Sequence, residues 1–111
     1  NITDRVQSPW HFNPNLQGMP QPFSGKIVGL SVCMNVSCTA GTATAKAVIN
    51  TTPDNTIVTT ISTTNPQFNR VNGGTATFAA GDKIQAAITT DGSFAPINNT
   101  SYIVVFVQYD T

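Results

Sequence analysis

Apolar and polar residues alternate in short stretches through residues 26–111, and turn-forming residues separate these stretches. Residues 43–49 are typical, because their three alanines and Ile49 fall on one face while Thr44 and Lys46 fall on the other. A period of two is the pattern of a strand with one buried face, and no stretch shows the 3.6-residue period of an amphipathic helix. The pattern predicts an all-β fold, an antiparallel β-sandwich or jelly roll.

The same alternation predicts further strands in residues 26–34, 56–62, 75–78, 82–89 and 101–110. In the first of these strands, the residues expected to share a buried face are Val28, Leu30, Val32 and Met34. In the stretch 82–89, the residues expected to point inward are Ile84, Ala86 and Ile88, and those expected outward are Lys83 and Gln85. Each assignment follows from the opposite directions of successive side chains along a strand.

Residues 1–25 differ from the rest, because they contain four of the seven prolines and show no alternation. Proline fixes φ and lacks a backbone donor, so this segment should be an extended arm and not a helix or an inner strand. Its apolar residues include Trp10 and Phe12, and apolar side chains are seldom left in water. We therefore expect the arm to lie across the sandwich domain of residues 26–111 or on a neighbouring subunit.

The last predicted strand is apolar on both faces. One face carries Tyr102, Val104, Phe106 and Gln108, and the other carries Ile103, Val105, Val107 and Tyr109. An antiparallel sheet usually leaves one face to solvent, so the second apolar face needs a cover. The arm could supply it, but we favour a partner subunit, with an interface that contains Tyr102, Val104, Phe106 and Tyr109.

Charged residues make up only 9% of the chain, against a usual share of about 25%, and the formal net charge is zero. The five basic residues are scattered, which argues against a nucleic-acid partner. No apolar run approaches the ~18 residues that a membrane helix needs, so we expect no membrane insertion. A neutral surface rich in Thr, Asn and Ser is typical of extracellular and virion-surface proteins.

The residues for common catalytic and metal sites are scarce. Zinc needs three or four suitably spaced ligands, and the chain offers two cysteines and one distant His11. The acids are all aspartates, and three of them lie in turn signals, where Asp caps its own turn: Asp54, Asp82 and Asp91. We therefore expect a protein that is not an enzyme and that uses no metal or cofactor.

Binding is easier to motivate than catalysis, because aromatic side chains occur beside amides and carboxylates in predicted loops. An exposed aromatic ring can stack on a sugar while its polar neighbours bind the hydroxyl groups. The loop of residues 89–101 is the best candidate and residues 62–74 the second. The candidate ligand-binding residues are Trp10, Phe68, Asp91, Phe94, Asn98 and Asn99. Each aromatic could instead plug an end of the sandwich or a subunit interface.

Cys33 and Cys38 flank a predicted turn, since the stretches 26–34 and 42–49 read as a β-hairpin joined by residues 35–41. A disulfide is possible if the two Cα atoms come within about 7 Å. Such a bond would indicate an oxidising compartment, whereas free thiols suit a protein that matures in the cytoplasm. We expect two free thiols.

A resemblance to known proteins lies in the last third of the chain. It is carried by the stretch Phe78–Ile84 with its Gly81-Asp82 turn, by the Thr-Asp-Gly-Ser loop that follows, and by the Val-rich last strand. This pattern resembles the distal domains of bacteriophage fibres, spikes and tail needles. It is also similar to trimeric jelly-roll heads of the tumour-necrosis-factor-like and C1q-like group. The resemblance covers residues 75–110, and implies a homotrimeric knob at the end of a longer fibre. It implies no particular site residues, because receptor loops vary most among such proteins.

The sequence and the resemblance together predict a receptor-binding knob of a phage fibre, on the virion surface, that attaches to a host-surface glycan or protein. Two alternatives stay open. The chain could be a purely structural virion part, such as a capsid decoration or fibre cap. It could also be a secreted, extracellular carbohydrate-binding or adhesin domain of a bacterium.

Overall fold

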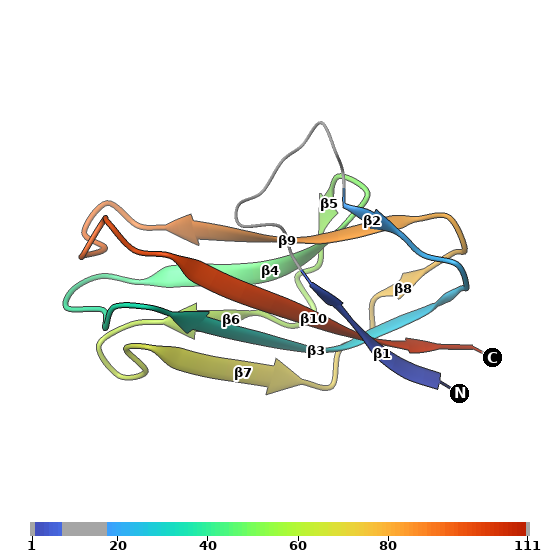
Figure 1. Ribbon diagram of the computed structural model, residues 1–111, viewed down its shortest axis with the longest axis horizontal. Coiled ribbons are helices and arrows are strands. Elements are labelled where there is room, and N and C mark those ends of the chain that lie inside the picture. The colour runs from blue at the N-terminus through green and yellow to red at the C-terminus, as the bar shows by residue number, and fades with distance from the viewer. Residues whose placement is uncertain (1, 8–17, 111) are drawn as a thin grey trace.

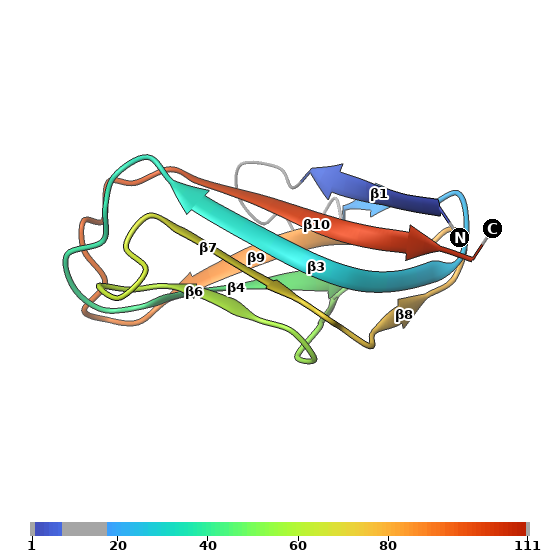
Figure 2. The same cartoon turned by 90° about the horizontal axis from the view of Figure 1, so that it is seen from below.

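A computed structural model describes the backbone of residues 2–7 and all atoms of residues 18–110, and in these ranges the chain forms two antiparallel sheets (Figure 1). Sheet A contains β1 (Ile2–Gln7), β10 (Ser101–Tyr109), β3 (Gly25–Met34), β7 (Phe68–Asn72) and β8 (Thr77–Phe78). Sheet B contains β2 (Met19–Pro20), β9 (Lys83–Thr90), β4 (Ala43–Ile49), β5 (Thr52–Pro53) and β6 (Thr59–Ile61). The two sheets lie face to face, with β9, β4 and β6 behind sheet A in Figure 2.

The strand order identifies the topology. Sheet A has the order β1-β10-β3-β7 and sheet B the order β2-β9-β4, with β6 also paired to β4. The chain is therefore a folded ribbon, in which β1 pairs with β10, β2 with β9, β3 with β7 and β4 with β6. Successive partners in this ribbon alternate between the two sheets, which is the arrangement of a jelly roll. The predicted all-β, antiparallel sandwich is confirmed.

The predicted hairpin of residues 26–34 and 42–49 is wrong. β3 belongs to sheet A and β4 to sheet B, so residues 35–42 cross from one sheet to the other. The alternation of apolar and polar residues correctly predicted both strands, but it does not indicate which strands pair with each other. Both cysteines are free thiols: Cys33 lies in β3, and Cys38 lies in this crossing, where it is buried with its Sγ 3.2 Å from the carbonyl oxygen of Ala40.

A β-bulge changes the predicted face of the first half of β3. Phe106 pairs with Gly29 and Val107 with Ile27, so Val28 is an extra residue in β3. A bulge shifts the alternation by one position. As a result Ile27 enters the core while Val28 is only half-buried, in place of the predicted reverse. The other predicted residues of this face are confirmed as buried: Leu30, Val32 and Met34.

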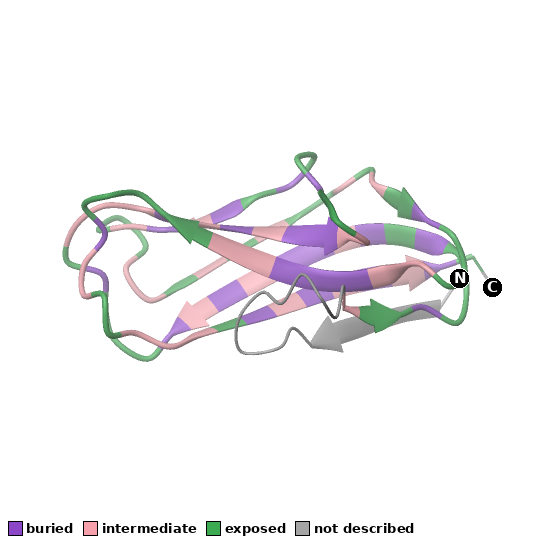
Figure 3. Cartoon of the chain, turned by 90° about the horizontal axis from the view of Figure 1, so that it is seen from above, coloured by how far each residue is buried: buried purple, intermediate pink, exposed green. Residues whose placement is uncertain are grey.

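The core joins large side chains of one sheet to small side chains of the other. Sheet A supplies Ile27, Leu30, Val32, Met34, Ile103, Val105 and Val107. Sheet B supplies Ala43, Ala45, Ala47 and Ala86, together with Ile61 and Ile84. Bulky residues opposite alanines allow two sheets to interdigitate without voids. The buried stretches follow the strands in Figure 3, while many loop residues at the two ends are exposed.

The prediction that Gln85 points to solvent is also wrong. Ile84 and Ala86 are buried in the core as predicted, but Gln85 between them is 0% exposed. Its cross-strand partner Val48 is buried as well, so the outer face of sheet B is covered at this place. Part of the cover is the backbone at Gly18, where an added Cβ would lie 2.3 Å from the carbonyl oxygen of Ile84.

The N-terminal segment takes part in both sheets at their edges. β1 pairs with β10 at the edge of sheet A, and β2 pairs with β9 at the edge of sheet B. Gln21, just after β2, accepts a 2.7 Å hydrogen bond at Oε1 from the hydroxyl of Tyr109 in β10. This buried bond joins the segment to the core. Trp10 and the rest of residues 8–17 lie outside the described residues.

Replacement of Tyr109 by Phe should lower the free energy of unfolding by about 1–3 kcal/mol, because Oε1 of the buried Gln21 would lose the hydroxyl that donates to it. Urea denaturation of Y109F measures this change. Ser24→Ala is the matched control, because it removes a hydroxyl whose bond to Asp110 is exposed, and it should change stability by less than about 0.5 kcal/mol. Equal effects of the two substitutions would contradict the role given to Tyr109.

Candidate functional site

The outer face of sheet A carries aligned rows of side chains across three neighbouring strands. Cys33 of β3 pairs with Phe68 of β7 on one side and with Tyr102 of β10 on the other. Two residues along, Ser31 pairs with Arg70 and with Val104 in the same way. Cross-strand partners point to the same face of a sheet, so each row has a small residue at its centre and larger residues at its ends.

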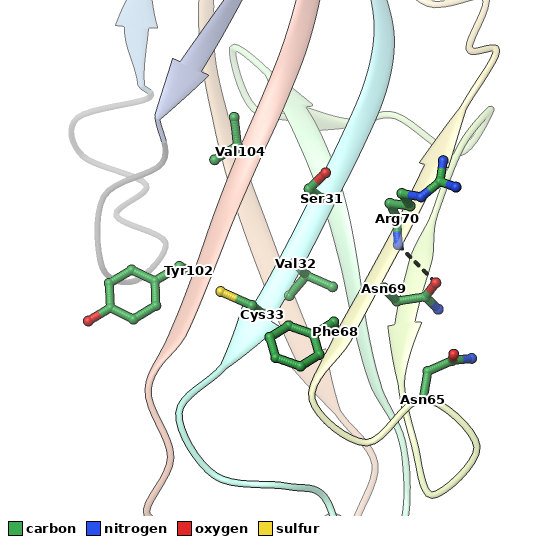
Figure 4. Close-up of a pocket in the computed structure, with 9 residues that line it drawn as sticks. All are labelled: Ser31, Val32, Cys33, Asn65, Phe68, Asn69, Arg70, Tyr102 and Val104. Carbon is green, nitrogen blue, oxygen red and sulfur yellow. Dashed lines mark hydrogen bonds between the residues drawn. The ribbon is translucent and has the colours of Figure 1, made fainter.

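These rows form a groove along β3, which we call the sheet A groove (Figure 4). Its floor consists of Ser31 and Cys33, and its walls of Phe68 and Arg70 on β7 and of Tyr102 and Val104 on β10. The hollow has a volume of about 490 Å³ and is open to solvent. The walls stand on strands that are two strand spacings apart, so their backbones are about 10 Å apart.

The two aromatic rings of the groove are accessible. Phe68 is 68% exposed and Tyr102 is 52% exposed. They lie on opposite sides of Cys33: Figure 4 shows the Phe68 ring beside Cys33, and the Tyr102 ring beyond β10, leaning away from Cys33. A single exposed apolar side chain is common on a folded surface, but two aromatic rings around one hollow mark a candidate site of interaction. The ring faces offer apolar surface on which a flat or ring-shaped ligand can stack.

Polar groups lie along the β7 side of the groove. Asn69 is held from both ends of its amide: its Nδ2 donates to the carbonyl of Thr60 at 2.8 Å, and its Oδ1 accepts from the backbone N of Arg70 at 2.8 Å. Its position therefore fixes the end of β7 against β6 rather than serving a ligand. Arg70 and Asn65 are exposed and line the groove, so their side chains can donate hydrogen bonds to a bound molecule.

Phe94, predicted to bind a ligand, lies in the hydrophobic core with 8% exposure. It packs at the end of the sandwich, close to Gly41, where an added Cβ would lie 2.4 Å from the backbone N of Phe94. Gly41 adopts φ +72°, a conformation that other residues rarely accept. Phe94 therefore has the plugging role that was the alternative for each aromatic residue. The little surface that it exposes lines a small hollow of about 160 Å³, which Asn99 and Ile97 also line.

Asp91 holds the same loop in place. Its Oδ2 accepts a hydrogen bond from the backbone N of Thr42 at 3.1 Å, and its Oδ1 accepts from the backbone N and the hydroxyl of Ser93. These bonds, that of Thr42 first, lower the pKa of the Asp91 carboxyl below its ordinary value of 3.8. Asp91 is thus occupied by its own loop, as the turn interpretation of this aspartate anticipates.

Asn99 joins two loops at the same end of the molecule. Its amide exchanges two hydrogen bonds with the backbone N and carbonyl of Val36, at 3.2 and 2.9 Å. Asn35 is joined to Thr100 by two hydrogen bonds as well: its Oδ1 accepts from the backbone N of Thr100, and its backbone N donates to the carbonyl of Thr100. The amide of Asn99 is therefore used within the chain, while Asn98 beside it is exposed. Neither residue lines the sheet A groove, so the structure does not bring them together with Phe68.

The residues predicted for a subunit interface divide between two faces. Tyr102, Val104 and Phe106 lie on the outer face of sheet A, the first exposed and the other two half-buried. Tyr109 lies in the core with 8% exposure, edge-on to the rings of Phe23 and Phe78. It therefore offers little surface for contact with another subunit. Tyr102 and Val104 form one wall of the groove, so the predicted interface and the groove share this face.

Sequence analysis missed Arg70 and Cys33 as parts of the site. The sequence feature that could have indicated the groove is the set of small residues in β3: Gly29, Ser31 and Cys33 alternate with buried side chains after the bulge. A central strand with small outward residues leaves a groove when its neighbours carry large ones. The register of β7 on β3 was needed to find those neighbours.

The described residues hold no group of three or more His, Cys, Asp or Glu side chains that could bind a metal ion. Within these residues there is likewise no helix long and apolar enough to cross a membrane. The concave surface best provided with accessible aromatic and polar groups is the sheet A groove, and its chemistry suits binding.

Comparison with known proteins gives no relative: no protein-family model matches the chain, and no curated protein matches its sequence. The function is therefore inferred from the groove and its side chains.

The lowered pKa of Asp91 predicts a pH effect on stability. A carboxyl whose folded pKa is depressed stabilises the fold above its unfolded pKa, here 3.8, and this stabilisation is lost as the pH falls through the lower folded value. D91N should therefore be less stable than the parent at neutral pH, and the difference should shrink below about pH 4. Urea midpoints measured from about pH 7 to about pH 2.5 test this, and a constant difference would contradict it.

Proposed function

We propose that this chain is a non-enzymatic binding module that holds a saccharide in the sheet A groove. The observation that carries the proposal is the pair of exposed rings, Phe68 and Tyr102, on the two sides of a floor of small residues. Pyranose rings present C–H groups on their faces and hydroxyl groups at their edges. Rings on the groove walls can stack on those faces, and the donors of Arg70 and Asn65 can bind the hydroxyl groups.

The groove is shallow, so a single site should bind weakly, with a Kd of about 1 mM. Weak sites become effective when several act together, because engagement of one raises the effective concentration of the others. We therefore propose a homotrimer, as the resemblance of residues 75–110 implies. In this proposal the protein is the receptor-binding knob of a phage fibre, on the virion surface, and its partner is a glycan of the host cell.

Two features support the phage assignment. The stretch that carries the resemblance folds as the three strands β8, β9 and β10, and Asp82 accepts a hydrogen bond from the backbone N of Ala79 in the turn before β9. The jelly roll is also an architecture found in viral capsid proteins and lectins. A secreted bacterial carbohydrate-binding or adhesin domain would use the same groove in the same way. Whether the gene lies in a phage genome or in a bacterial genome distinguishes these two functions.

A second candidate function is a purely structural virion part. Phe106 extends the apolar outer face of β10 from Val104, in the groove wall, to beyond the groove, and such a face suits contact with another subunit. In that case Tyr102 and Phe68 would be buried between copies instead of binding a saccharide. The two candidates therefore make opposite predictions for substitutions in the groove.

Replacement of Phe68 or Tyr102 by Ala should weaken saccharide binding by at least about tenfold, because each ring supplies stacking surface at the centre of the site. The measurement is binding to an array of bacterial surface oligosaccharides. Ile97→Ala is the matched control, since Ile97 is exposed but lies in a loop away from the groove. It should bind as the parent does.

Light scattering of the same proteins separates the two candidates. The knob predicts a trimer of the 11.7 kDa chain in the parent and in F68A. A monomeric parent would contradict the knob. If F68A or Y102A dissociates the trimer and the parent binds no array member, the groove is a subunit contact and the structural candidate is favoured.

A further inference from the structure

Arg70 is placed to bind whatever occupies the groove. It lies on β7 two residues after Phe68 and on the same face, so the two Cα atoms are about 7 Å apart. Across β3, its row continues through Ser31 to Val104. Arg70 is exposed, and Figure 4 shows it on β7, one row beyond Phe68, with its guanidinium group turned away from Ser31. Because this long side chain is exposed and lines the groove, a change of rotamer can bring the guanidinium over it. A ring stacked on Phe68 would thus lie within reach of the guanidinium group.

The described residues provide no counter-ion for Arg70. Their carboxylates are engaged elsewhere: Asp54 with Thr56, Asp82 with Asn50 and Ala79, Asp91 with Thr42 and Ser93, and Asp110 with Ser24. None of these acids lines the groove, and Arg70 is the only charged residue among those that do. In a chain with zero net charge and 9% charged residues, an unpaired guanidinium in the groove is a specific feature.

We infer that the saccharide bound in the groove is acidic, and that Arg70 binds its carboxylate or sulfate group. This inference rests on the proposed function and assigns the ligand class of the same site. Guanidinium groups form paired hydrogen bonds with planar carboxylates and with sulfate oxygens, and these charge-assisted bonds are stronger than bonds to neutral hydroxyl groups. The sugar ring stacks on Phe68 or Tyr102, and its anionic substituent points along β7 to Arg70.

The test compares matched oligosaccharides that share one backbone and are neutral, carboxylated or sulfated. The proteins are the parent, R70Q and F68A, with Lys26→Gln as the control. Lys26 is also an exposed cation of sheet A, but it lies on β3 roughly 16 Å from Ser31. K26Q therefore removes the same charge from the same sheet without touching the groove. Thermal unfolding of each variant checks that the fold is intact.

The parent should bind an acidic member roughly tenfold or more tightly than the neutral one. R70Q should lose that preference and keep the weaker affinity for the neutral member, and K26Q should behave as the parent. Raising the salt concentration should weaken acidic binding to the parent but not to R70Q. The carboxylated and sulfated arms show which anion the site takes.

Two outcomes would overturn the inference in different ways. If the parent binds neutral and acidic members equally, and F68A but not R70Q abolishes binding, the groove binds saccharides and the acidic specificity is wrong. If the parent binds no member of either series, the proposed function fails together with the inference. An equal loss of neutral and acidic binding in R70Q would also overturn it, because Arg70 would then not discriminate by charge.

Discussion

The pairing of β3 with β10 is the contact on which both the core and the groove depend. The two strands pair along the whole of β10 and occupy the centre of sheet A. Their inward residues form the sheet A half of the core, and their outward residues form the floor and one wall of the groove. Because successive side chains alternate in direction, a single register fixes both surfaces at once. A shift by one residue would bury Tyr102 and expose Val105.

The bulge at Val28 adjusts this pairing along the strand. It lets β3 bury Ile27 at one end and Leu30, Val32 and Met34 at the other. On the outer side it places Gly29 opposite Phe106, where an added Cβ would lie 3.5 Å from the Phe106 Cβ. A distance of 3.5 Å is ordinary van der Waals contact, so large neighbours on β10 and β7 flank the small outward residues of β3 without clashing. The groove is what remains above them.

The strands could be predicted from the sequence because side-chain alternation is a local property. The pairing of strands could not, since it depends on contacts between residues far apart: β3 and β4 are consecutive yet lie in different sheets. The same limit applies to the site. Phe68 was found as an aromatic residue in a polar segment, but Arg70 and Cys33 join it only through the register of β7 on β3. Phe94 and Tyr109 are also aromatic residues next to polar ones in the sequence, yet they lie in the core, because burial is decided by the whole fold.

The central claim is that the sheet A groove, and not the loops at the end of the sandwich, is the binding surface. It is tested most directly by backbone amide chemical shifts during titration with the array oligosaccharide that binds best. The claim predicts shifts that centre on residues 29–33, 68–72 and 102–106, which belong to β3, β7 and β10. Shifts confined to residues 35–41 and 91–100, or to the strands of sheet B, would contradict it.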